Sequence, residues 1–230
     1  ITAGVDVQPD RLEVTLIGWS MKVRYVLGHF VIRGSASLQS TWDEVDSLLA
    51  TVWKHPLGGT IGVEAACVDS GDGNMTQRVY DFCEGVQARK IVAIKGRAGP
   101  HPVLQASRSR RRNRTAPLYL VGVDQVKTDI LVSLPLERGE TNAFRFSNTL
   151  TEDWFKQVTA ERRELKYKQG RPEVAFVRIG RRAAEALDCV VYAIAAKQLC
   201  HFDFESRYEA LKGRPVEKPS LKSLAARLHG

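Results

Sequence analysis

The sequence predicts an α/β fold in which a mixed sheet, three antiparallel strands followed by parallel ones, is flanked by helices. Three observations predict it. The first 33 residues hold three segments of strand character joined by short turns, which is typical of an antiparallel meander. Further apolar strands then alternate with segments of helical periodicity, which favours parallel strands joined by crossover helices. A long and unusually apolar helix is expected near the C-terminal end.

The meander accounts for the antiparallel part of the sheet. Its strands are predicted over residues 2–8, 11–20 and 23–33, and Pro9 with Asp10 forms the first turn. The first strand has the composition of a strand buried on both faces. The second alternates apolar and polar side chains, which is typical of a half-buried strand.

Helices and strands are expected to alternate in the middle of the chain. The predicted segments are a helix from Thr41 to about Lys54, a strand over Thr60–Asp69, a helix over 75–84, a strand over Lys90–Lys95, a strand over Pro117–Val121 and a helix over Val123–Leu134. This order matches a ribonuclease-H-like architecture, in which the first and fourth strands lie side by side and parallel.

The last third of the chain is expected to be mainly helical. A helix is predicted from Thr151 to about Glu164, a polar loop over 166–171 and the apolar helix from Arg181 to Leu199. We therefore expect one ribonuclease-H-like domain over residues 1–204, which contains a mobile basic loop at about 97–116. A basic C-terminal tail over 205–230 is expected to follow it.

The composition is that of a soluble globular protein with a basic surface. The 34 Lys and Arg residues exceed the 26 Asp and Glu residues and give a formal net charge of +8, which favours a polyanionic partner. The four cysteines are widely spaced and form no CxxC pair, so neither a zinc site nor a disulfide framework is indicated. No apolar run reaches membrane-spanning length and no signal peptide is evident, which favours an intracellular setting.

Three carboxylates occupy positions where carboxylates are disfavoured. Asp6 lies inside the apolar first strand, Asp69 ends the fourth strand, and Asp188 lies inside the apolar helix. A buried lone carboxylate is costly unless a cation or hydrogen-bond donors neutralise it. Because the first and fourth strands are expected to be adjacent and parallel, their acids can approach one sheet edge, and the helix can pack across it and supply the third.

Three oxygen donors without His or Cys suit Mg²⁺ or Mn²⁺ better than zinc. Two such ions about 4 Å apart can activate a water and stabilise the leaving oxygen in phosphodiester hydrolysis. In this interpretation Asp6 bridges both ions, while Asp69 and Asp188 each complete one site.

Each acid also has a purely structural interpretation. Asp6 could cap the turn that follows its strand, and Asp69 could simply begin a turn. Asp188 could form a buried salt bridge with Arg181 or Arg182. Three further acids could compete with the triad or supplement it, namely Glu64, Asp72 and Glu185.

Several motifs in fixed order carry a family resemblance. They are Ala3–Gln8 with Arg11–Val14, Val68–Gly71, Val79–Cys83, Ala93–Gly96, Gly122–Lys127, Leu150–Glu161 and Glu185–Cys189. Over roughly residues 2–200 they resemble the nuclease domain of the lambda-type phage terminase large subunit. The resemblance implies a metal-dependent endonuclease that cuts concatemeric viral DNA during genome packaging in the host cell cytoplasm. It also assigns the metal-binding acids to Asp6, Asp69 and Asp188.

Partners follow from the same resemblance. It implies double-stranded DNA as substrate, an N-terminal ATPase motor in the full protein, a terminase small subunit and a portal or procapsid, with no membrane. The chain has no G-x-x-x-x-G-K-[ST] phosphate loop and begins with Ile, so we expect a C-terminal fragment without the motor. The cationic side chains expected to contact DNA phosphates are Lys95, Arg97, Arg108, Arg110, Arg111, Arg112, Lys127, Arg181 and Arg182.

Two rival functions fit the same pattern. A transposase or integrase would share the architecture, although its last acid is usually Glu, which weighs against it because residue 188 is Asp. A non-catalytic DNA-binding module would keep the fold and the basic loop, and would bind DNA in a salt-sensitive way without needing a metal.

Overall fold

The computed structural model describes residues 1–107, 117–137, 139–168 and 170–213. Contacts divide the chain into two compact units, Ile1–Thr51 with Gly62–His201, and Val52–Ile61 with Phe202–Gly230. The smaller unit contains the strand β4 (Val52–Lys54), which pairs with β5 (Thr60–Gly62), and the helix α6 (Phe204–Leu211). No helix in the described ranges is both long and apolar enough to cross a membrane.

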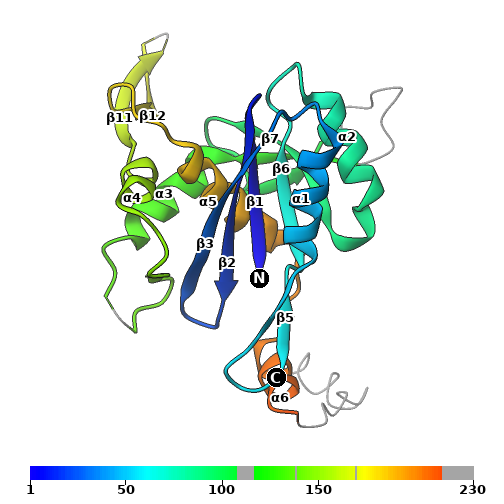
Figure 1. The fold of residues 1–230 in the computed structure, drawn as a ribbon. Coiled ribbons are helices and arrows are strands. Elements are labelled where there is room, and N and C mark those ends of the chain that lie inside the picture. The colour runs from blue at the N-terminus through cyan, green and yellow to red at the C-terminus, as the bar shows by residue number, and fades with distance from the viewer. Residues whose placement is uncertain (108–116, 138, 169, 214–230) are drawn as a thin grey trace, which may run out of the picture. The chain divides into compact units, whose positions relative to one another are not determined.

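An eight-stranded mixed sheet forms the centre of the larger unit (Figure 1), with the order β10-β3-β2-β1-β6-β7-β9-β8. Its strands are β1 (Thr2–Val7), β2 (Arg11–Trp19), β3 (Arg24–Arg33), β6 (Ala65–Asp69), β7 (Ile91–Arg97), β8 (Leu104–Ala106), β9 (Leu118–Gly122) and β10 (Phe144–Phe146). The first three strands are antiparallel, whereas β1, β6, β7 and β9 are mutually parallel. The predicted mixed sheet and the predicted parallel pairing of the first strand with the strand that ends at Asp69 are both confirmed.

Helices cover the two faces of this sheet. They are α1 (Gln39–Ala50), α2 (Thr76–Gly85), α3 (Val123–Ser133), α4 (Glu152–Val158) and α5 (Glu185–Ala196), with short 3₁₀ turns at Gln87–Arg89 and Lys197–Leu199. In Figure 1, α5 lies behind the first strands and α1 lies in front of the sheet. The apolar helix α5 packs across β1, β2 and β6, and its buried Val190 and Val191 share one core cluster with Ile17, Cys67 and Ile94 of the strands.

The segment after α4 differs from the prediction. A helix to about Glu164 and a loop over 166–171 were expected, but α4 ends at Val158 and a hairpin follows. The hairpin pairs β11 (Glu161–Lys168) with β12 (Arg171–Arg178). Its first strand is mostly charged and most of the hairpin's described side chains are exposed, so it lacks the one-sided apolar periodicity by which a half-buried strand is recognised.

Element boundaries account for the other differences. The helix expected to reach Lys54 stops before Thr51, whose extended backbone leads into β4, as β-branched residues favour. The single strand expected over Thr60–Asp69 is interrupted, and only its second half, β6, joins the main sheet.

Three further regions have a different secondary structure from the one predicted. The basic loop expected at about 97–116 contains β8, a three-residue edge strand that is too short to show a periodicity of its own. The helix expected from Arg181 begins only at Glu185, after a turn at Gly180 with a φ of 62°. The segment expected as a tail begins with α6.

Candidate active site

Asp6 lies on the face of β1 that α5 covers. Thr2, which shares this face because side chains alternate along a strand, donates its hydroxyl to the Ala193 carbonyl at 2.7 Å. The Asp6 side chain is buried, and Gln8 donates its side-chain amide to Asp6 Oδ2 at 2.6 Å. Burial raises the pKa of Asp6 from 3.8 to about 7; the Gln8 hydrogen bond opposes this rise, and the nearby carboxylates Asp188 and Asp69 add to it.

Asp69 ends β6, the parallel neighbour of β1. Burial raises its pKa from 3.8 to about 6, and repulsion from Asp188 adds to the rise. The Gly71 backbone N–H donates to Asp69 Oδ1 at 3.0 Å and works in the opposite direction, as does the positive charge of Lys95. Asp69 therefore begins a turn, as expected if its role were purely structural. It also lies close enough to Asp188 for the charge of Asp188 to raise its pKa.

Asp188 lies in the first turn of α5 and is partly exposed. Burial raises its pKa; the ammonium group of Lys127, at 3.4 Å from Asp188 Oδ1, opposes the rise. The predicted alternative, a salt bridge of Asp188 with Arg181 or Arg182, is wrong. Among the described residues Asp188 forms its ion pair with Lys127 instead.

The structure therefore brings the three predicted acids together on one side of the sheet. Asp188 raises the pKa of both Asp6 and Asp69, so the three charges lie close enough to repel. Within the part of the chain that the structure describes, however, no three His, Cys, Asp or Glu side chains are arranged to hold a single metal ion. The donor set is composed of oxygen atoms and suits a hard divalent cation, whereas the bridging role of Asp6 stays a prediction.

A fourth carboxylate, Glu161, joins the site from the first position of β11. It accepts a hydrogen bond from Lys127 at 2.8 Å, and Arg178 of β12 lies 3.9 Å away. Lys127 thus stands between Glu161 and Asp188, and Glu161 adds to the raised pKa of Asp188. Sequence reasoning missed Glu161 as a site residue because the pattern predicts a helix there, although Glu161 closes one of the family motifs.

A second buried network adjoins Asp6 on the neighbouring strands. Glu13 of β2 stands directly opposite Asp6 in the antiparallel register, and it accepts hydrogen bonds from Arg11 at 2.6 Å and His29 at 3.2 Å. Burial alone would raise the pKa of Glu13, but these two hydrogen bonds hold it below its usual value. The other ring nitrogen of His29 lies 2.9 Å from the Thr15 hydroxyl. Arg11 shares a face of β2 with Glu13, whereas only the strand register identifies His29 as a partner.

The three competing acids lie in different settings. Glu185 approaches Arg11 at 3.4 Å and has a second oxygen, Oε2, that is buried without a hydrogen-bond partner among the described residues. Asp72 accepts the Asn74 backbone N–H at 3.0 Å and so closes the loop after β6. Glu64 precedes β6, and its backbone N–H donates to the Ile1 carbonyl at 2.9 Å.

The predicted DNA-contacting cations are placed as follows. Lys95 is half-buried on β7, Arg97 is exposed at the end of that strand, and Arg181 and Arg182 are exposed in the turn before α5. Lys127 is buried against two carboxylates instead of projecting into solvent. Four arginines lie outside the described residues, namely Arg108, Arg110, Arg111 and Arg112.

Comparison with known families decides where the chain belongs. The sequence model described as terminase large subunit gpA, endonuclease domain, matches residues 1–209. The chain belongs to this family. It is 27% identical over 245 residues to a protein named terminase, large subunit, of Enterobacteria phage P21, and 29% identical over 249 residues to the protein of the same name from Escherichia phage lambda. Both comparisons cover the whole chain, which spans 37% and 38% of the length of those relatives. No solved structure matches it significantly.

Proposed function

We propose that this terminase endonuclease domain is a divalent-metal-dependent DNA endonuclease that cuts concatemeric viral DNA during genome packaging. The observation that carries the proposal is the meeting of Asp6, Asp69 and Asp188 on one side of the sheet, where burial raises the pKa of all three. Such a cluster is unfavourable when fully ionised, and a cation relieves that cost. Family membership supports the same reaction.

Asp6, Asp69 and Asp188 are the residues that would hold two Mg²⁺ or Mn²⁺ ions, and Glu161, whose charge acts on Asp188, would assist. When bound, such ions activate a water molecule and stabilise the leaving oxygen of a phosphodiester. The donor chemistry fits, since every candidate ligand is a carboxylate oxygen.

The cationic side chains would hold the DNA. The positive charge of Lys95 lowers the pKa of Asp69, so Lys95 lies near that acid and would bind a phosphate next to it. Arg97, Arg181 and Arg182 are exposed and would contact phosphates further along the backbone, which fixes the register of the duplex without reading its bases. Lys127 would keep Asp188 and Glu161 in position, and it gains access to a phosphate only if it leaves them.

In the full protein we propose an N-terminal ATPase motor, a terminase small subunit and a portal or procapsid as partners, with action in the host cytoplasm. The support is that the relatives are named terminase large subunits and that this chain matches little more than a third of their length.

The test is plasmid nicking by the purified chain with Mn²⁺, Mg²⁺ or EDTA, beside three asparagine variants, Asp6→Asn, Asp69→Asn and Asp188→Asn. Asp81→Asn is the matched control, because Asp81 is exposed on α2 and accepts a hydrogen bond from Gln77 of the same helix. We expect cutting that requires metal, persists in the control and is lost in the three folded variants.

Retained gel-shift binding of DNA without metal-dependent cutting would contradict the proposal and favour a non-catalytic DNA-binding module. Cutting that survives all three substitutions would place the chemistry elsewhere in the chain.

A further inference from the structure

The outer edge of β3 is longer than the strand that covers it. β10 pairs only with Arg24–Val26, while β3 continues to Arg33. In the described ranges no other strand pairs with β3 on that side, so its second half forms an edge of the sheet. Edges of this kind can accept another strand, and proteins usually protect them with charges, prolines or a covering segment.

The hydrogen-bonding pattern shows which backbone groups point outward. Gly34 donates its N–H to the Asp10 carbonyl, and an antiparallel ladder alternates between bonded and non-bonded pairs. The backbone groups of Ile32 and Phe30 therefore point toward β2. Those of His29, Val31 and Arg33 point away from the sheet, where an added strand would meet them.

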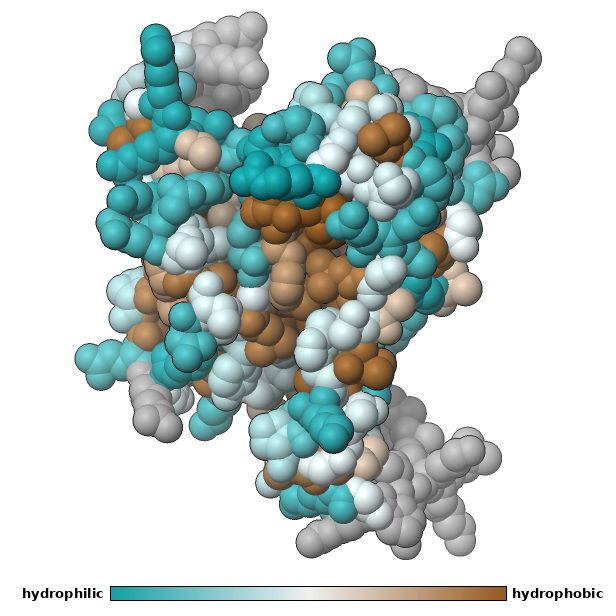
Figure 2. All heavy atoms as spheres, viewed as in Figure 1, coloured by the Kyte–Doolittle hydropathy of each residue, from teal (hydrophilic) through white to brown (hydrophobic). Residues whose placement is uncertain are grey.

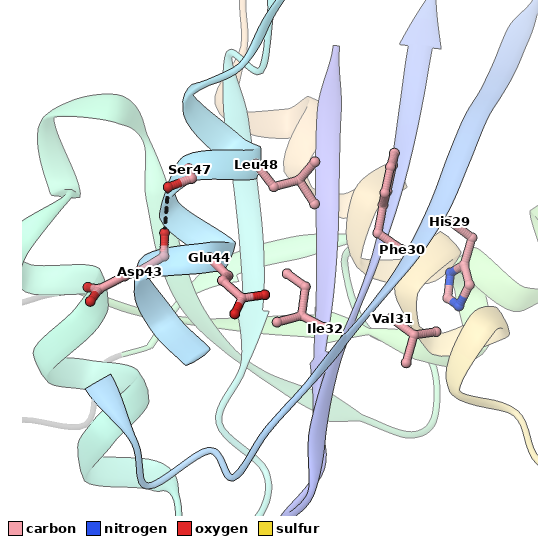
Figure 3. Close-up of a pocket in the computed structure, with 8 residues that line it drawn as sticks. All are labelled: His29, Phe30, Val31, Ile32, Asp43, Glu44, Ser47 and Leu48. Carbon is pink, nitrogen blue, oxygen red and sulfur yellow. Dashed lines mark hydrogen bonds between the residues drawn. The ribbon is translucent and has the colours of Figure 1, made fainter. Parts of the chain in front are cut away.

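A groove of about 620 Å³ runs beside this edge, between β3 and α1. Figure 3 shows Phe30 and Ile32 on the strand, with Leu48 and Glu44 of α1 directed toward them. Phe30 is 39% exposed and Val31, on the opposite face, is 45% exposed, so apolar surface lies on both sides of the edge. Apolar side chains also gather in the middle of the face drawn in Figure 2, over β1–β3 and beside α1.

Apart from the exposed Arg33 at the end of the edge, the charged side chains beside the groove are acidic. Besides His29, which contacts Glu13 and Thr15, the titratable side chains that line it are Asp43 and Glu44. No ion pair to either acid is found among the described residues. An occupant that carries a lysine or arginine next to apolar residues would therefore be complementary to it.

We propose that the edge of β3 from His29 to Arg33 is a docking site for an extended basic and apolar peptide segment of another protein, which adds as a strand to the sheet. Its backbone would bond to His29, Val31 and Arg33. Its alternate side chains would lie on Phe30 and Leu48 on one face and on Val31 on the other, and a basic residue would meet Glu44. The proposal does not depend on the nuclease reaction.

The test titrates the ¹⁵N-labelled chain with a capped peptide of the sequence Lys-Val-Thr-Val-Thr-Val-Lys, followed by amide NMR. We expect shifts and slowed amide exchange at His29, Val31 and Arg33, together with shifts at Glu44 and Leu48. The same peptide with N-methylated backbone amides should not bind, because it cannot form the ladder. An acidic version with Glu in place of both Lys residues should bind about two- to fivefold more weakly.

Two variants locate the interaction on the protein. Glu44→Gln should reduce the difference between the basic and acidic peptides, with Asp43 still present, while Phe30→Ser should weaken the binding of both peptides. Val132→Ser is the matched control, since Val132 is a 65% exposed apolar side chain on α3, outside the groove. Equal binding of the N-methylated peptide, or shifts confined to other surfaces, would overturn the proposal. So would concentration-dependent shifts at β3 without peptide, which would assign the edge to a second copy of this chain.

Discussion

Gly4 of β1 lies directly against Cys189 of α5: a Cβ atom on residue 4 would stand 2.0 Å from the Cys189 carbonyl oxygen. The same atom would lie 2.5 Å from the Ala193 backbone nitrogen. Only glycine permits this approach of helix to strand. Gly4 lies two residues before Asp6 and so on the same face of β1, and Cys189 is next to Asp188 on α5. The contact between Gly4 and Cys189 therefore fixes how closely Asp6 and Asp188 approach each other.

Gly4→Ala should therefore disturb both stability and the site. Because the clash involves backbone atoms that no rotamer change relieves, we expect a loss of about 3 kcal/mol or more in the free energy of unfolding. The measurement is denaturant unfolding followed by circular dichroism, beside Gly85→Ala. A Cβ at Gly85 meets nothing within 4 Å, so that control should change stability by about 1 kcal/mol or less. Equal effects of the two substitutions would show that α5 tolerates a wider spacing.

Asp6 makes stability depend on pH. Its pKa is about 7 in the folded chain against an ordinary value of 3.8, so the folded state binds the proton more tightly than the unfolded state. The contribution of Asp6 to the free energy of unfolding is then fully present below about pH 4 and is lost as the pH rises toward 7. Asp69, with a pKa of about 6, acts in the same direction. In EDTA we expect the metal-free chain to lose up to about 4 kcal/mol between these limits through Asp6 alone.

Asp6→Asn is the control for that dependence. An amide cannot ionise, so the variant should be more stable than the wild type at pH 8 and should show a flatter pH profile between 4 and 7. Thermal unfolding across this range in EDTA measures both. Parallel profiles of the wild type and Asp6→Asn between pH 4 and 7 would mean that Asp6 is neutralised in the folded chain by a partner other than a proton.

Lys127 is expected to be a structural cation of the site. It is 8% exposed and pairs with Glu161 and Asp188, so Lys127→Met leaves two carboxylates without this partner. Removing one member of a buried pair typically costs about 3–5 kcal/mol, and the partial exposure of Asp188 places the expected loss near about 3 kcal/mol. Lys156→Met is the matched control. It breaks an exposed ion pair with Glu152, so it should lower the free energy of unfolding by about 0.5 kcal/mol or less.

A second substitution distinguishes charge from packing at this position. If uncompensated charge causes the loss, Glu161→Gln should restore part of the stability of Lys127→Met. No recovery in the double variant, measured by the same unfolding experiment, would indicate that the lysine stem fills space that methionine does not.

The sequence alone predicts the two strands and the helix that carry Asp6, Asp69 and Asp188. Asp6 and Asp69 could be placed because each lies in or ends an apolar strand pattern, and parallel neighbours end at the same sheet edge. Glu161 could not be placed, since the hairpin that begins with it is largely exposed and shows no apolar period. The cross-strand neighbours of Glu13, Asp6 and His29, depend on strand register, which no local pattern encodes.

The turn before α5 supplies a prediction about DNA. Arg181 and Arg182 are exposed, and the helix that follows them carries Asp188, so a phosphate close to the acids would lie within their reach. Double substitution to alanine should weaken binding of duplex DNA about equally for all sequences. It should also reduce the slope of log affinity against log salt by about one for each phosphate that an arginine no longer neutralises.

Fluorescence anisotropy at several salt concentrations measures this slope. Lys22→Ala is the control, because Lys22 is an exposed cation in the turn that joins β2 to β3. That turn lies at the end of β2 far from Glu13, the residue that pairs with Asp6. An unchanged slope in the double arginine variant would mean that DNA approaches the acids from a side that these arginines do not reach.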